Sequence, residues 1–117
     1  MAANNLAAIG RLTAASFQGA CDLYEIGVPA MHTMYHAMTT APGILCARQT
    51  GAGFGGCMVA LVACEQVEDF VRSVRHSYHQ AAGTEPAVNT VRAAAGAGVM
   101  SAQPIATAMK AETETSR

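Results

Sequence analysis

Apolar residues at helical spacing predict two helices in the first third of the chain. Residues 4–23 form the first, because apolar side chains recur there at intervals of three, at Leu6, Ile9 and Leu12. Pro29 suits a first helical turn, where its missing N–H costs nothing, and a second helix is predicted over 29–39. The apolar stripe of this second helix is expected to pack in the core and consists of Met31, Met34, Tyr35 and Met38.

A third helix is predicted over residues 65–81, where the pattern is clearest. Most charged residues lie on one face, and the opposite face is apolar, with Val67, Phe70, Val71, Val74 and Tyr78. Gly83 is expected to end this helix, and Pro86 should prevent its continuation.

Three short apolar runs predict strands. Residues 44–49 and 57–63 flank the sequence TGAGFGG, residues 50–56, and two strands joined by a tight connection are most simply antiparallel. The second run is apolar on both faces and is therefore expected at the centre of the sheet. Residues 87–92 are predicted as a third strand that returns to the sheet after the helix.

This order of elements predicts an α+β fold, in which helices pack on one face of a small antiparallel sheet. We expect one domain over residues 1–100. Residues 101–117 have little apolar content and no periodicity, and they are predicted to form a flexible tail.

Composition and charge argue against several classes of partner. Apolar residues make up 51% and charged residues 13% of the 117 residues, whereas about 25% charged residues is usual. Either the many small alanines account for the high apolar and low charged content, or a partner covers apolar surface of the chain. A net charge of −1 without a basic cluster argues against a nucleic-acid partner.

The run around CMVALVAC is too short to span a bilayer, and the first residues lack a signal-peptide pattern, so a cytoplasmic location is expected.

Cysteine and histidine spacings do not predict a metal or redox centre. The four cysteines lack CxxC spacing and are expected to be reduced and buried; they are Cys21, Cys46, Cys57 and Cys64. Cys46 and Cys57 should lie near each other on neighbouring strands, without a bond. His32 and His36 have i,i+4 spacing, but no third ligand completes a metal site nearby, and the same holds for His76 and His79.

Two interpretations of TGAGFGG remain open from its spacing. A hairpin needs glycine for positive φ angles, but two to five residues suffice for that connection. A loop with successive exposed N–H groups can also form an anion-binding concavity, for which phosphate is the usual guest. No Lys-Ser or Lys-Thr follows, so the loop is not a Walker A motif. It leads into a strand, so it lacks the context of a dinucleotide fingerprint.

Three segments together resemble galactokinases of the GHMP kinase superfamily. ARQTGAGFGGCMVALV, residues 47–62, is closely similar to the third motif of that family. SFQGACDLYEIGVPAMHTM, residues 16–34, resembles the segment upstream of the motif, with Ser16, Leu23, Tyr24, Glu25 and Pro29 in matching places. HSYHQAAGTEPAV resembles the family's last helix and strand, with Tyr78, Gly83 and Pro86 in register. The resemblance covers about residues 10–100.

The resemblance implies a ferredoxin-like C-terminal lobe of an ATP-dependent sugar kinase. Such an enzyme phosphorylates a galactose-like sugar at the anomeric hydroxyl and uses ATP and Mg²⁺. The glycine motif would line the cleft between the lobes, near the transferred phosphoryl group. The cleft residues implied are Thr50, Gly51, Ala52, Gly53, Phe54, Gly55 and Gly56. Arg48 stands at the basic position before the loop and is a supporting candidate.

Several family features have no match in this sequence. The first motif, the serine-rich second motif of type GLSSSA and the catalytic aspartate with its arginine partner belong to the N-terminal lobe. Asp22 and Asp69 do not match that aspartate. Phe17 replaces a common histidine, and Ala30 replaces a common glutamate.

Two hypotheses follow for the function of the chain. In the first, it is the C-terminal lobe of a galactokinase-like kinase. The isolated chain is then expected to be inactive and to have no ATP or Mg²⁺ cofactor. In the second, it is a stand-alone binding or dimerisation module derived from such a lobe. The implied partners are an N-terminal lobe or a second copy of the chain.

Overall fold

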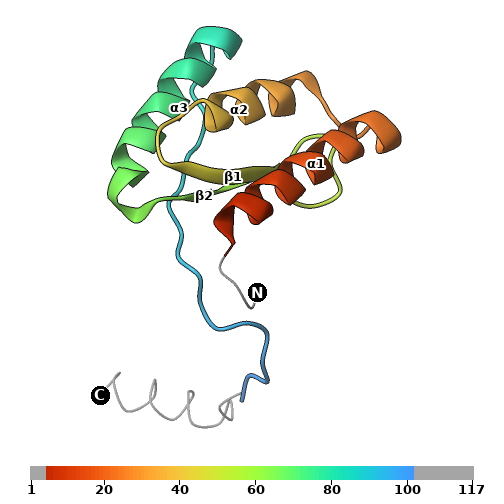
Figure 1. The fold of residues 1–117 in the computed structure, drawn as a ribbon, viewed down its shortest axis with the longest axis vertical. Helices are drawn as coiled ribbons and strands as arrows, with labels where there is room; N and C mark the ends of the chain where they lie inside the picture. The colour runs from red at the N-terminus through yellow and green to blue at the C-terminus, as the bar shows by residue number, and fades with distance from the viewer. Residues whose placement is uncertain (1–4, 102–117) are drawn as a thin grey trace, which may run out of the picture.

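The computed structural model describes residues 5–101 (Figure 1). The elements in chain order are α1 (Leu6–Tyr24), α2 (Pro29–Thr39), β1 (Ile44–Gln49), β2 (Met58–Val62), the 3-10 helix η1 (Cys64–Gln66) and α3 (Val67–Ala82). The three helices and the first two strands predicted from the sequence are therefore present. The predicted tail lies outside the described residues, apart from Ser101.

Hydrogen bonds at both ends define α1. The Asn5 side chain accepts a hydrogen bond from the Ala8 N–H at 3.0 Å and caps the N-terminus. Glu25 ends the helix in the left-handed conformation with φ 54°, and its N–H donates to the Ala20 carbonyl. Phe17 and Ala20 are buried. This end of α1 leads directly into the turn that meets the glycine-rich loop.

The methionine stripe of α2 packs in the core, as predicted. Met31 and Met38 are buried, and Met34 and Tyr35 pack against the core with part of their surface exposed. Pro29 occupies the first turn of α2, as its fixed φ favours.

β1 and β2 form a two-stranded antiparallel sheet, as predicted. Ala47 pairs with Ala60, and the alternation of a strand turns these two residues toward the helices. Arg48 pairs with Val59 on the other side, which we call the outer face. The exposed residues of the outer face are Leu45, Arg48, Val59 and Leu61.

β2 is not a central strand, which corrects the prediction from its two apolar faces. Within residues 5–101 it pairs with β1 alone, so its other edge is open. Its inner residues pack under the helices, whereas Val59 and Leu61 are about half exposed. The apolar pattern indicated that both faces favour burial, but it did not indicate whether this part of the chain covers both.

The core lies between α2, α3 and the inner face of the sheet. Its buried members are Ala37, Met38, Ala41, Ala47, Phe70 and Val74. α3 contributes Phe70 and Val74 from its apolar face, and Gly83 ends it at φ 75° by donating its N–H to the His79 carbonyl. The predicted α+β class, with helices packed on a small antiparallel sheet, is confirmed.

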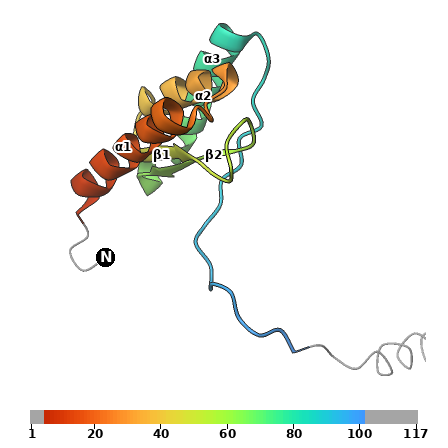
Figure 2. The same ribbon diagram turned by 90° about the vertical axis from the view of Figure 1, so that its right-hand side faces the viewer.

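The third strand predicted over residues 87–92 is absent, and this prediction was wrong. The segment is extended but forms no ladder with β1 or β2. Val88 packs against the core, whereas Val91 is 80% exposed. One partly buried valine gives too little burial to fix a strand against the sheet. In Figures 1 and 2 the chain after α3 passes the sheet without lying along either strand.

Candidate functional site

The sequence TGAGFGG, residues 50–56, connects β1 to β2 and is called the glycine loop below. At its base the Thr50 N–H donates to the Cys57 carbonyl at 2.9 Å. All four glycines have φ between 80° and 119°, a region that side chains strongly disfavour. Phe54 also has a positive φ, 59°. The number of glycines therefore has a backbone cause that is independent of any ligand.

Most N–H groups of the glycine loop have no hydrogen-bond partner in the part of the chain that the structure describes. Phe54 is an exception, because its N–H donates to the Ile26 carbonyl at 2.8 Å. Within residues 5–101, no hydrogen bond is donated by the N–H groups of Gly51, Ala52, Gly53, Gly55 and Gly56. Several of these residues are exposed. Successive unpaired N–H groups on irregular backbone can bind an anion. Within residues 5–101 such groups occur at Gly51 to Gly53 and at Gly55 and Gly56.

The connection between α1 and α2, residues 25–28, supports the glycine loop from one side. We call it the α1–α2 turn. A Cβ placed on Gly53 would lie 2.6 Å from the Cβ of Ile26, so only glycine permits this approach. Gly51 and Gly55 have open space at the same position. The loop thus has one tightly packed glycine between two that are free of contact.

Arg48, just before the glycine loop, and Phe54, within it, have exposed side chains. Arg48 lies on the outer face of β1, and within the described part of the chain it forms no ion pair. The Phe54 side chain is 69% exposed on a backbone that a bulky residue disfavours.

Gln49 is a polar residue in the core that sequence reasoning did not single out. It lies between Arg48 and the loop, is only 5% exposed, and turns to the helix side of the sheet. Its side-chain oxygen Oε1 is buried and has no hydrogen-bond partner among residues 5–101. The alternation of side chains along β1 could have predicted that Gln49 lies on the inner face. That its Oε1 atom lacks a hydrogen-bond partner among residues 5–101 is seen only in the structure.

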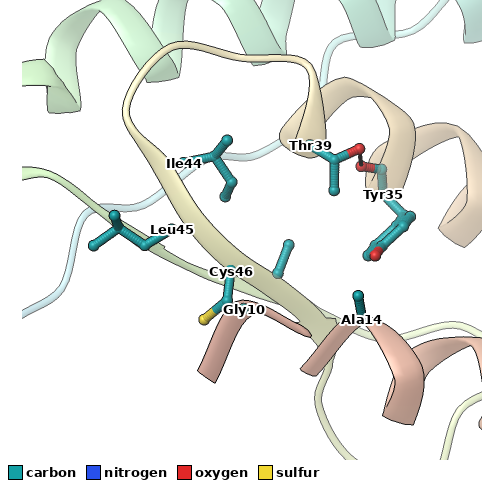
Figure 3. A pocket seen from close by; sticks show the side chains of 8 residues that line it. Gly10, Ala14, Tyr35, Thr39, Ile44, Leu45 and Cys46 are labelled. Carbon is teal, nitrogen blue, oxygen red and sulfur yellow. Dashed lines mark hydrogen bonds between the residues drawn. The ribbon is translucent and has the colours of Figure 1, made fainter. Parts of the chain in front are cut away.

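A cavity of about 180 Å³ lies between α1, α2 and β1, away from the glycine loop (Figure 3). Gly10 and Ala14 of α1 line one side, and Tyr35 and Thr39 of α2 line another. The Thr39 hydroxyl donates to the Tyr35 carbonyl within its own helix. None of the residues that line the cavity belongs to the predicted cleft.

The four cysteines are free. Cys46 pairs with Leu61 across the sheet, so Cys46 and Cys57 are on neighbouring segments but are not opposite each other. Cys57 and Cys64 are exposed, and Cys21 and Cys46 are half-buried, which corrects the expectation that all four are buried. Burial raises the pKa of the Cys21 thiol, and the nearby Asp22 carboxylate raises it further.

Two of the histidines and both aspartates considered above make ordinary side-chain contacts. The His32 ring meets Phe17 edge-on at 5.9 Å between centroids, and His79 Nδ1 lies 3.4 Å from a Glu85 oxygen. The Asp22 carboxylate accepts a hydrogen bond from Gln18, and Asp69 pairs with Arg72 at 3.1 Å. Among residues 5–101, no three or more His, Cys, Asp or Glu side chains gather to hold a metal ion.

None of the helices in residues 5–101 has both the length and the apolar content needed to cross a membrane.

Sequence comparison finds galactokinases. The chain is 37% identical over 98 residues to a galactokinase of Streptococcus thermophilus, a match that covers 84% of this chain and 25% of that protein. It is 39% identical over 82 residues to a galactokinase of Clostridium perfringens, covering 70% of this chain and 21% of that protein. The chain thus spans at most about a quarter of the length of these curated relatives. No protein-family model matches it.

Structure comparison agrees. The crystal structure of Lactococcus lactis galactokinase complexed with galactose matches this chain with a TM-score of 0.67 and 38% sequence identity. The match covers 72% of this chain and 22% of that one.

Proposed function

This chain is homologous to the C-terminal region of galactokinases, and on that premise we propose that it serves as the C-terminal lobe of a galactokinase-like sugar kinase. The complete enzyme would transfer the γ-phosphoryl group of ATP to the anomeric hydroxyl of a galactose-like sugar. The observation that carries this proposal is the glycine loop, with its positive φ angles and unpaired N–H groups, in a chain with this homology.

In the proposed enzyme the glycine loop forms one wall of the cleft. Within residues 5–101 the N–H groups of Gly51, Ala52, Gly53, Gly55 and Gly56 are unpaired. They would donate toward the charge on the phosphoryl group, which needs positioning and electrostatic stabilisation more than covalent chemistry. Thr50 and Phe54 would hold the shape of the loop, because their N–H groups donate to carbonyls within the protein. Arg48 would add positive charge at the edge of this wall. These roles fit the exposed, unpaired amides of the loop.

ATP and Mg²⁺ enter only in the complete enzyme. ATP would supply the phosphoryl group, and the loop N–H groups are chemically suited to a phosphate oxygen. The family resemblance assigns the catalytic base to the N-terminal lobe. We assign the magnesium ligands to that lobe as well, since within residues 5–101 no three or more His, Cys, Asp or Glu side chains gather to hold a metal. On this view the chain by itself binds ATP weakly at most. A cytoplasmic location is consistent with the proposed role in sugar metabolism.

Complementation tests the proposal. The full chain is mixed with the N-terminal part of the Lactococcus lactis galactokinase, and galactose-dependent release of ADP is measured. We expect activity only when both parts are present. Gly55→Val, which introduces a side chain at φ 119°, should abolish that activity. Binding of the two parts without activity, with the wild-type loop, would contradict the proposal.

A second candidate is a dimerisation module, which the exposed apolar side chains of the outer face favour. Leu45, Val59 and Leu61 lie together there, and β2 has an open edge. An N-terminal lobe would cover the same surface. The mass of the chain in solution therefore distinguishes the dimerisation module from the kinase lobe. A stable homodimer that the N-terminal part cannot dissociate would favour the module over the kinase lobe.

A further inference from the structure

Ile26 joins the end of α1 to the glycine loop through both of its backbone polar groups. Its N–H donates to the Ala20 carbonyl at 3.4 Å, in the last turn of α1. Its carbonyl accepts the Phe54 N–H at 2.8 Å, in the middle of the loop. Ala20 is buried, so the helix end to which Ile26 is attached is itself fixed by the core.

The Ile26 side chain makes the second contact with the loop. A Cβ on Gly53 would meet Ile26 at 2.6 Å from Cβ, 2.7 Å from Cδ1 and 2.9 Å from Cγ1. Real Cβ atoms do not approach carbon so closely, so the backbone of Gly53 lies directly against this side chain. Close packing of this kind leaves Gly53 little room to move toward Ile26.

The other side of the α1–α2 turn is also packed. A Cβ on Gly27 would lie 2.6 Å from His32 Nε2 and 3.0 Å from the Cys21 sulfur. Gly27 therefore lies between side chains from both helices, and the turn has little room to move away from the loop.

We infer that Ile26 is a positioning residue that holds the glycine loop in its ligand-facing shape before any ligand arrives. This inference rests on the proposed function, in which the ligand of the loop is a phosphoryl group. Ile26 fixes Gly53 and Phe54, and the flanking N–H groups of Gly51, Ala52, Gly55 and Gly56 stay unpaired. Donors that are already oriented need no reorganisation when negative charge appears near them. The resemblance that identified the loop did not include Ile26 among the cleft residues.

The experiment compares Gly53→Ala with Gly51→Ala in the full chain. Both alanines carry the strain of a positive φ, 90° and 80°, but only the one at position 53 meets Ile26. Amide hydrogen exchange is followed by NMR. We expect the Phe54 N–H to exchange at least about tenfold faster in Gly53→Ala than in Gly51→Ala, because opening of the loop alone exposes it.

The amide of Val74 in the core reports global unfolding in the same experiment. It should exchange equally in both variants, because a positioning contact changes the loop and not the whole fold. Equal exchange of Phe54 in the two variants would overturn the inference. Acceleration of Val74 as large as that of Phe54 would also overturn it, since the contact would then serve stability alone.

Ile26→Gly supplies the matched rescue. It removes all three side-chain atoms that an alanine at position 53 would meet. In this background Gly53→Ala should accelerate Phe54 exchange no more than Gly51→Ala does, which is a double-mutant cycle on one contact. A full tenfold effect that persists without the Ile26 side chain contradicts the inference. The experiment uses neither sugar nor ATP, so failed complementation would remove the kinase proposal without changing this outcome.

Discussion

The ring of Phe17 stacks on the ring of Tyr35, with centroids 4.1 Å apart and planes inclined by 20°. Phe17 comes from α1 and Tyr35 from α2, and the edge of His32 completes the contact. This stack joins the two helices whose connecting turn supports the glycine loop. The position of that loop therefore depends on aromatic packing in the helical layer.

Truncating Phe17 should strongly destabilise the chain. The side chain is only 3% exposed, and replacing a buried phenylalanine by alanine typically costs about 3–5 kcal/mol. We expect Phe17→Ala to lower the free energy of unfolding in urea by that order. Leu23→Ala is the control, because Leu23 is 80% exposed on the same helix, and should change it by less than about 0.5 kcal/mol. Similar values for the two variants would contradict the packing described here.

Gln49→Met should stabilise the chain. The Gln49 Oε1 atom is buried without a partner, and an unsatisfied buried polar group costs about 1–3 kcal/mol. Methionine has a similar length and no such group, so the midpoint of urea unfolding should rise. Gln49→Glu, with the same shape and a charge, should lower it. A lower midpoint in Gln49→Met would show that the amide has a partner in solution.

Glu25→Gly should also stabilise the chain, although it removes a side chain. Glu25 has φ 54° at the end of α1, a conformation that glycine adopts without penalty. The gain is expected at about 0.5–1 kcal/mol by thermal unfolding. Glu25→Val should instead destabilise, because a β-branched residue is poorly tolerated there. Equal melting temperatures in the two variants would mean that residue 25 leaves the left-handed conformation in solution.

The thiol of Cys21 should make stability fall at alkaline pH. Burial, and then the Asp22 carboxylate, raise its pKa above the usual 9.0, so the folded chain holds this proton more tightly than the unfolded chain. The Cys21 thiol therefore adds to the free energy of unfolding. This stabilisation is fully present below the pKa of the thiol in the unfolded chain and is lost as pH rises through its pKa in the folded chain. The difference in unfolding free energy between wild type and Cys21→Ala should therefore shrink as pH rises above the usual thiol pKa of 9.0. A difference that is constant or grows would contradict this sign.

Helices and turns could be predicted from the sequence because local spacing determines them. Apolar residues three and four apart lie on one helical face, which is why the stripe of Met31 and Met38 was correctly assigned to the core. The positive φ angles of the glycine loop follow similarly from residue type. For the glycine loop, sequence and family resemblance also indicated the candidate site, which remains a proposal.

Pairing between distant segments could not be predicted in the same way. The apolar character of β2 indicates that both faces favour burial, but not what covers them. The short run around Val88 suggests a strand, yet the partial burial of a single valine does not fix a strand against the sheet. The contact between Ile26 and Gly53 joins residues that are far apart in sequence, so no local pattern encodes it. The buried oxygen of Gln49 depends in the same way on which groups surround it.

The open edge of β2 has a practical consequence for handling the chain at high concentration. Met58–Val62 contains no charge and no proline, the residues by which natural edge strands avoid pairing with one another. Val59 and Leu61 add an apolar surface beside this edge. Concentrated solutions should therefore form intermolecular sheet and precipitate, and a lysine in place of Val59 should delay that process.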